Sequence, residues 1–245
     1  MTYCIAVRLD DGLVFLSDTR TNAGVDNIST YRKLHVIQPA DDRVFVIQSA
    51  GNLATTQEVL DRIDRDLNTP LVGETLATVD HLFEAALYVG RISREVVASH
   101  RDALGASGAD GTATFILGGQ IIGSRPEIFL VYPEGNYIRA SATRPFLQIG
   151  ETKYGKFWLE LLLLHGHPDL AIATKIALAS MLGTARANLS VGPPYDLAVY
   201  HNGSLKLDEH RIEANSGYLV ELQQVFIDHL VEAFGDLPPI PWSTD

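Results

Sequence analysis

The stretch from residue 2 to residue 20, TYCIAVRLDDGLVFLSDTR, contains two apolar runs separated by a turn. The runs at 2–9 and 13–18 are rich in β-branched, aromatic and leucine side chains, and the Asp-Asp-Gly between them is a turn signal. The pattern predicts a β-hairpin whose first strand begins at residue 2. A threonine therefore stands at the start of that strand, directly after Met1.

Similar patterns follow along the whole chain, and only the polar segment 19–31 has no sustained period. The Gly-rich segment 105–111 ends the first helical block. We expect, in chain order, strands at 2–9, 13–18, 33–38 and 43–50, helices at 53–67 and 76–103, strands at 112–122, 127–135, 137–142 and 145–150, helices at 151–164 and 168–187, strands at 195–201 and 204–208, and a helix at 216–234.

This order of elements shows no regular βαβ alternation and no internal repeat. The block of strands from 112 to 150 predicts a second sheet. The simplest layering is α+β, with two antiparallel sheets and helices packed outside them. We expect one domain over 1–235, including the last helix, and a Pro-rich arm over 236–245.

Composition excludes several classes of partner. The 245 residues include 19 Lys and Arg against 30 Asp and Glu, a net charge of −11, which argues against nucleic acid and anionic membranes as partners. The single cysteine, Cys4, cannot form an intrachain disulfide, which fits a reducing compartment. With no leader pattern and no apolar run of about 20 residues, we expect a cytoplasmic protein.

Thr2 combines two chemical groups if the initiator methionine is removed. Its α-amine, with a reference pKa of about 7.7–8.0, can then act as the base for its own hydroxyl. No histidine is needed for such a nucleophile. The alternative is that Met1 stays in place and Thr2 is an ordinary first strand residue.

Two further residues are expected near Thr2 from the hairpin pattern. Asp18 ends the returning strand beside the start of the first, and Lys33 begins the next hairpin. Asp18 can pair with Lys33, whose positive charge would favour the threonine alkoxide. Taken singly, Asp18 is also a good turn residue and Lys33 a common exposed strand end.

With these residues in this spacing, the chain resembles the proteasome β-type family of N-terminal nucleophile hydrolases. More narrowly, its first 35 residues, GETKYGK (150–156) and NLSVGPPYDL (188–197) are similar to Anbu, the bacterial proteasome-related family. The resemblance implies a four-layer αββα sandwich, self-assembly into a ring or open spiral, and a threonine-type site of Thr2, Asp18 and Lys33. It also implies that the backbone amide of Gly51, in the SAGN turn, stabilises the oxyanion.

The chain departs from the β-subunit pattern late in the sequence. The family brings an Asp and a Ser to the threonine amine, whereas TARANLSVGPP has Asn188 near the Asp position and Ser190 as the nearest hydroxyl. Arg20 completes the family's Asp-x-Arg and is a supporting candidate, as are Asn188 and Ser190. Glu151 or Thr152 stands where many β subunits have a serine. An amide cannot supply the missing negative charge, so these departures point to weak activity.

Other candidate sites have simpler explanations. Cys4 lies on the same strand face as Thr2, yet a cysteine in a first strand is usually a small buried side chain. The HGHPD segment (165–169) offers two histidines and an aspartate, but it has no spaced partner motif and fits a loop between helices. The glycines of LGGQIIGS do not form a nucleotide-binding pattern. We therefore expect neither a metal nor a cofactor.

These observations lead to a self-assembling threonine-type peptidase or amide hydrolase that acts on short peptides. Two alternatives stay open: an amide hydrolase of non-peptide substrates on the same fold, and a non-catalytic oligomeric scaffold that retains Met1. The sequence identifies neither a partner ATPase nor the side chain that the site prefers.

Overall fold

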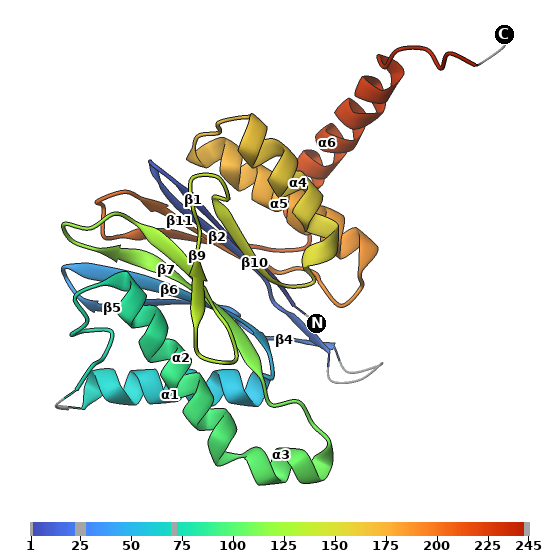
Figure 1. Cartoon of the computed structure of the whole chain (residues 1–245). Coiled ribbons are helices and arrows are strands. Elements are labelled where there is room, and N and C mark those ends of the chain that lie inside the picture. The colour runs from blue at the N-terminus through green and yellow to red at the C-terminus, as the bar shows by residue number, and fades with distance from the viewer. Residues whose placement is uncertain (1, 23–27, 70–72, 243–245) are drawn as a thin grey trace.

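The computed structural model describes residues 2–22, 28–69 and 73–242. Two five-stranded sheets lie face to face, and helices cover the outer face of each (Figure 1). This confirms the predicted four-layer αββα sandwich. Met1 and residues 243–245 of the predicted arm lie outside the described residues.

The first sheet contains the first two and the last three strands of the chain. All its neighbouring pairs are antiparallel. Its strands, in spatial order, are β10 (Phe146–Gly150), β1 (Tyr3–Leu9), β2 (Gly12–Asp18), β11 (Tyr195–His201) and β12 (Leu207–Ile212).

The second sheet is a simple meander in chain order, also antiparallel throughout. Its strands are β5 (Leu34–Ala40), β6 (Arg43–Gly51), β7 (Ala113–Ile121), β8 (Glu127–Val131) and β9 (Tyr137–Arg139). A separate short pair, β3 (Arg20–Asn22) and β4 (Ile28–Thr30), lies within the segment for which the sequence predicts no strand.

The predicted second sheet is present, but the strands between 112 and 150 are divided between the two sheets. β7 to β9 extend the hairpin of β5 and β6, while β10 crosses to the first sheet and pairs with β1, placing Gly150 opposite Tyr3. Alternation along a strand reports which faces are buried, and it carries no information about which strand is the neighbour.

The helices differ from the prediction mainly in the first block. The stretch predicted as one helix over 76–103 starts later and breaks at His100, and its second part runs into the segment predicted as a Gly-rich loop. Glu84 fixes the start, because its carboxylate accepts a bond from the His81 amide at 2.9 Å. The helices are α1 (Leu53–Asn68), α2 (Leu82–Ser99), α3 (Arg101–Ser107), α4 (Thr152–His165), α5 (Leu170–Ala187) and α6 (Gly217–Gly235).

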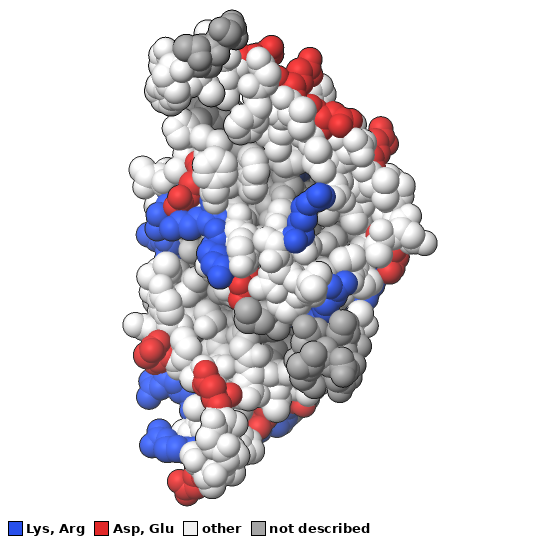
Figure 2. Space-filling view, turned by 90° about the vertical axis from the view of Figure 1, so that its right-hand side faces the viewer, with Lys and Arg blue, Asp and Glu red and all other residues white. Residues whose placement is uncertain are grey.

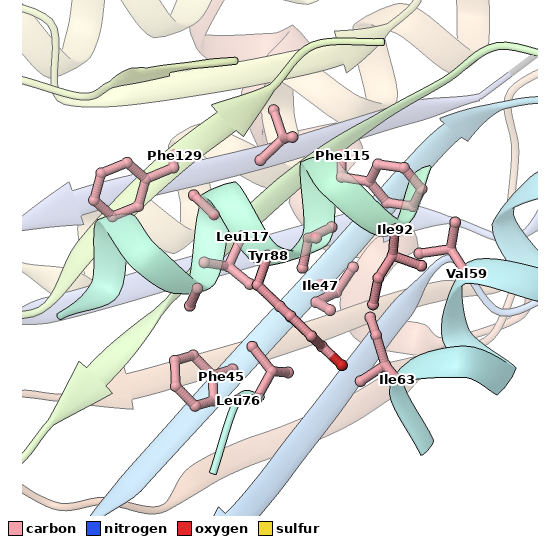
Figure 3. Close-up of a cluster of buried hydrophobic side chains, with 14 of the residues drawn as sticks. Phe45, Ile47, Val59, Ile63, Leu76, Tyr88, Ile92, Phe115, Leu117 and Phe129 are labelled. Carbon is pink, nitrogen blue, oxygen red and sulfur yellow. The ribbon is translucent and has the colours of Figure 1, made fainter. Parts of the chain in front are cut away.

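Three apolar layers hold the sandwich together. One lies between α1, α2 and the second sheet, and Figure 3 shows Tyr88 and Ile92 of α2 among side chains of that sheet. Another lies between α4, α5 and the first sheet, and the third lies between the two sheets. α5 is long and apolar enough to cross a membrane, but half of it is buried, as in the core helix of a globular domain.

The last helix stands apart from these layers. α6 leaves the sandwich beside α4 and α5 and points away from it (Figure 1). Leu219 at its base is buried, and the Phe226 ring packs edge-on against Trp158 of α4 with ring centroids 5.2 Å apart. Toward its end, Val231 and Phe234 are 69% and 72% exposed.

Candidate active site

The first hairpin brings Thr2 and Asp18 together. Asp18 is the last residue of β2, and its Oδ1 accepts a hydrogen bond from the backbone amide of Tyr3 at 2.9 Å. Asp18 is fully buried, while Thr2 is partly exposed. The start of the first strand is thereby fixed against the end of the second.

Lys33 approaches the same carboxylate from the second sheet, one residue before β5. Its Nζ lies 2.8 Å from Asp18 Oδ1 and 2.6 Å from the Arg20 carbonyl oxygen. Burial raises the pKa of Asp18, and the Lys33 charge opposes that rise. Because both side chains are buried, removing either one would leave an uncompensated buried charge.

A small pocket opens where these residues meet. Its wall includes Thr2, Lys33 and Gly51, so three of the four predicted catalytic residues line it and Asp18 lies directly behind Lys33. The other lining residues are Thr21, Tyr31, Ser49, Ala50, Leu53 and Thr56.

Gly51 owes its place to backbone geometry. Its φ is +115°. A Cβ added there would lie 2.5 Å from the carbonyl oxygen of Thr112, the residue before β7. Only glycine avoids both the strained φ and the clash. That its amide binds an oxyanion stays a prediction.

Sequence reasoning missed the residues that hold the backbone of Thr2. The Thr2 carbonyl accepts a hydrogen bond from the Glu151 amide at 2.7 Å, just after β10. Gly150 has φ +85°, and a Cβ there would lie 1.8 Å from the Thr2 carbonyl oxygen. The Gly-Glu pair of GETK was visible in the sequence, but its contact with Thr2 depends on β10 joining β1.

The Tyr3 side chain holds the start of β1 against α5 and β10. Its hydroxyl lies 2.8 Å from Ser180 Oγ of α5 and also accepts a bond from Gln148 of β10. Burial raises the pKa of Tyr3 to about 12. The phenol therefore stays neutral at physiological pH and serves as a fixed hydrogen-bonding group.

The three supporting candidates lie in and around the loop between α5 and β11. Arg20 Nη1 donates to the Leu189 carbonyl at 2.7 Å. Asn188 Oδ1 accepts from the amide and the hydroxyl of Ser190, at 3.0 Å and 2.6 Å. The bonds of Asn188 and Ser190 are local to the loop, and a role of these two residues at Thr2 stays a prediction.

The chain is similar in sequence and structure to several solved Anbu proteins. Anbu (ancestral beta-subunit) from Yersinia bercovieri is 41% identical over 98% of this chain and 100% of that chain, with a TM-score of 0.90. Anbu from Pseudomonas aeruginosa, solved as a helical assembly, is 40% identical over 99% and 100% of the two chains, also at 0.90. Anbu from Hyphomicrobium sp. is 42% identical over 97% and 99%, at 0.86.

The chain belongs to the Anbu family. This confirms the resemblance and gives the αββα sandwich its family name, the proteasome β-like N-terminal nucleophile hydrolase fold. No protein-family model and no curated protein sequence matched the chain.

The remaining candidates of the sequence have structural explanations in this Anbu chain. Cys4 is fully buried between the sheets, and burial raises its thiol pKa, so it is a poor nucleophile. Asp169 caps α5 by accepting from the Ile172 amide at 2.8 Å, and His165 contacts a carbonyl of its own helix. Within the described ranges no cluster of three metal-ligating side chains occurs.

Proposed function

We propose that this Anbu protein is a threonine-type amide hydrolase that acts on short peptides after Met1 is removed. The observation that carries the proposal is the buried Lys33–Asp18 pair behind the pocket that Thr2 and Gly51 line. A positive charge held beside a hydroxyl favours its alkoxide form. The Asp18 carboxylate holds the lysine ammonium in place.

In the proposed reaction, the Thr2 α-amine takes the proton of the Thr2 hydroxyl, and Oγ attacks the substrate carbonyl carbon. The resulting oxyanion is stabilised by the Gly51 amide. Collapse of the intermediate breaks the C–N bond, and the proton on the α-amine passes to the leaving amine. Water, deprotonated by the same amine, then hydrolyses the ester and regenerates Thr2.

The experiment compares parent, Thr2→Ser and Thr2→Ala proteins, each with Met1 shown by intact mass to be absent. We expect the serine variant to keep measurable turnover of a fluorogenic peptide and the alanine variant to lose several orders of magnitude in rate. The melting temperatures should agree closely, since at most about one hydrogen bond, 0.5–1.5 kcal/mol, is removed. Parent-like turnover by Thr2→Ala would end the proposal.

A panel of non-peptide amides run beside the peptides tests the closest alternative, an amide hydrolase of other substrates. One observation favours that alternative: Asn188 stands near the position where the β-subunit pattern has an aspartate, and its amide oxygen accepts from Ser190 of the same loop. Activity on non-peptide amides alone would replace the peptidase proposal with this alternative.

We further propose that the protein works in the cytoplasm as a homo-oligomer, a ring or an open spiral of identical subunits. The Pseudomonas aeruginosa relative was solved as a helical assembly. Exposed apolar side chains follow α4 at heptad positions, namely Tyr154, Phe157, Leu161 and Leu164, and continue along α6 and the arm. On the face drawn in Figure 2, Lys and Arg occur in separate groups with uncharged surface between them.

A further inference from the structure

The candidate active site is shared between the two sheets. Thr2 directly precedes β1 and Asp18 ends β2 of the first sheet, whereas Gly51 ends β6 of the second sheet and Lys33 directly precedes β5. A shift of one sheet over the other would therefore move the nucleophile relative to the lysine and the pocket wall. Whatever fixes the sheets near this end also fixes the site.

The layer between the sheets is mostly apolar, so it offers few directional contacts. Gln48 of β6 is an exception. It is fully buried, and its Nε2 donates to the Leu16 carbonyl oxygen of β2 at 3.0 Å. Leu16 lies two residues before Asp18, and Gln48 pairs in register with Leu34, the residue after Lys33. One side chain thus connects β2, the strand of Asp18, with β6, which ends at Gly51 and pairs with the strand that follows Lys33.

Three buried oxygen atoms without a described partner lie on Gln48 itself, on the residue after Leu16 and on the residue opposite it in β11. Gln48 Oε1, Ser17 Oγ and Asp196 Oδ2 have no hydrogen-bond partner among the described residues. Ser17 follows Leu16 and lies directly opposite Asp196 of β11. Asp196 is 5% exposed, and its other oxygen accepts from Arg211 at 3.1 Å. Buried polar atoms are almost always satisfied, and where protein atoms do not serve, a buried water does.

The chemistry of the three atoms matches one water molecule. The Gln48 and Asp196 oxygens can only accept, and a water has two hydrogens to give them. The Ser17 hydroxyl can donate to the same water. All three partners face the space between the sheets and none belongs to the reacting groups.

We propose that Gln48 is a positioning residue of the threonine site, acting through its bond to Leu16 and through a buried water that it shares with Ser17 and Asp196. The expected effect of Gln48 on kcat rests on the proposed function. In structural terms, we infer that this polar cluster fixes the position of one sheet over the other at the end where Asp18 and Lys33 meet.

A second glutamine provides a matched control at the opposite end of the sheets. Gln120 of β7 is 5% exposed, and its Nε2 donates to Asn202 Oδ1 at 3.1 Å. Its Oε1 accepts from the Gly203 amide at 2.8 Å and from the Tyr200 hydroxyl. It joins the second sheet to the far end of β11, away from the pocket.

The test compares Gln48→Met and Gln120→Met in the Met-processed protein. Both variants remove a buried amide and should lower the melting temperature. Only Gln48→Met should lower kcat, by about 10- to 100-fold, because small misplacements of reacting groups are that costly. KM should change little, since the pocket wall is retained. An equal kcat for Gln48→Met and Gln120→Met would overturn the proposal.

Crystal structures of the parent and both variants separate this inference from the proposed function. We expect a water within hydrogen-bonding distance of the three oxygens in the parent. In Gln48→Met the Lys33–Asp18 distance should lengthen beyond hydrogen-bonding range, and in Gln120→Met it should not. If the parent shows no turnover, the proposed function fails and these distances still decide the role of Gln48. An unchanged Lys33–Asp18 pair in Gln48→Met, or three oxygens satisfied without water, would refute it.

Discussion

The phenol of Tyr3 shows how a residue beside the proposed nucleophile can be structural. Its hydroxyl contacts α5 through Ser180 and β10 through Gln148. It therefore joins β1 both to its neighbour in the sheet and to the helix that covers the sheet. These contacts fix the start of β1 and thereby the backbone of Thr2, which directly precedes it.

We predict that Tyr3→Phe lowers the free energy of unfolding by about 1–3 kcal/mol, because Gln148 and Ser180 lose a buried partner. Chemical denaturation at pH 7 measures this loss. Ser180 keeps its bond to the Gly155 carbonyl at 3.0 Å, which limits the loss. A loss below about 0.5 kcal/mol would contradict the anchoring role.

The same residue predicts a dependence on alkaline pH. The pKa of Tyr3 rises from 10.0 to about 12 on folding, so ionisation favours the unfolded chain. Its contribution to stability is full below pH 10 and is lost as the pH rises through about 12, at up to about 1.4 kcal/mol per pH unit. Tyr195 has a similar shift. We therefore expect Tyr3→Phe to show a shallower decline than the parent between pH 10 and 12, measured by denaturation at each pH.

Two glycines offer a controlled test of the Thr2 backbone contact. Gly150 and Gly203 have similar φ angles, +85° and +80°, but only Gly150 has an atom within reach of an added Cβ, the Thr2 carbonyl. Gly203→Ala should show the cost of the φ angle alone, about 1 kcal/mol. Gly150→Ala should be less stable than Gly203→Ala and should lose turnover. Equal melting temperatures and equal rates in the two variants would show that the contact is unimportant.

At the residue scale, the sequence could predict candidate site residues that lie at the ends of local hairpin strands. Thr2, Asp18 and Lys33 could be found because each stands at a strand end of a recognisable hairpin. Gly150 could not, because its role depends on contact with a residue almost 150 positions away. The pattern also predicts Asn188 and Ser190 near Thr2; their described bonds form a local turn, and the contact with Thr2 stays a prediction.

At the scale of the elements, the two residues that follow Asp18 make hydrogen bonds to the loop between α5 and β11. Arg20 donates to Leu189, and its guanidinium lies so close to Gly192 that a Cβ there would be 2.4 Å from Cζ. Thr19 adds a bond to the Pro194 carbonyl at 2.7 Å. The two residues after Asp18 therefore position this loop.

We predict that Arg20→Ala increases hydrogen exchange in 188–194 and costs about 0.5–1.5 kcal/mol of stability, since it removes one hydrogen bond at a partly exposed site. Mass-resolved exchange measures the first effect. Arg8→Ala is the matched control, because Arg8 makes the same kind of bond, to the Pro126 carbonyl at 3.1 Å, far from this loop. Equal exchange of 188–194 in both variants would mean that Arg20 does not restrain the loop.

The kinds and order of elements were largely predictable, and their ends and partners were not. Periodicity identified helical segments over 76–103, yet the break at His100 left no mark that periodicity could register. The crossing of β10 into the first sheet was missed because its apolar pattern is the same in either sheet. Short strands such as β3 contain too few residues to show a period.

For the molecule as a whole, the exposed apolar surface of α4 and α6 predicts self-association. We expect Phe157→Glu, and separately Val231→Glu with Phe234→Glu, to shift sedimentation toward the 26.8 kDa monomer. Gln224→Glu is the control for the α6 variant, since it adds charge to that helix without removing an apolar side chain. A parent that sediments only as a monomer at micromolar concentration would reject the proposed oligomer, and unaltered assembly in the glutamate variants would place the contacts elsewhere.

The pairing of the first strand also has a consequence for timing during synthesis. Thr2 leaves the ribosome first, but its carbonyl is held only when residues 150 and 151 are made, and the neighbour of Asp18 in β11 comes later still. Domains fold as units once their long-range contacts can form. A growing chain therefore carries Thr2 without the assembled pocket until β11 has been made, and the proposed hydrolase activity would begin only at that late stage of synthesis.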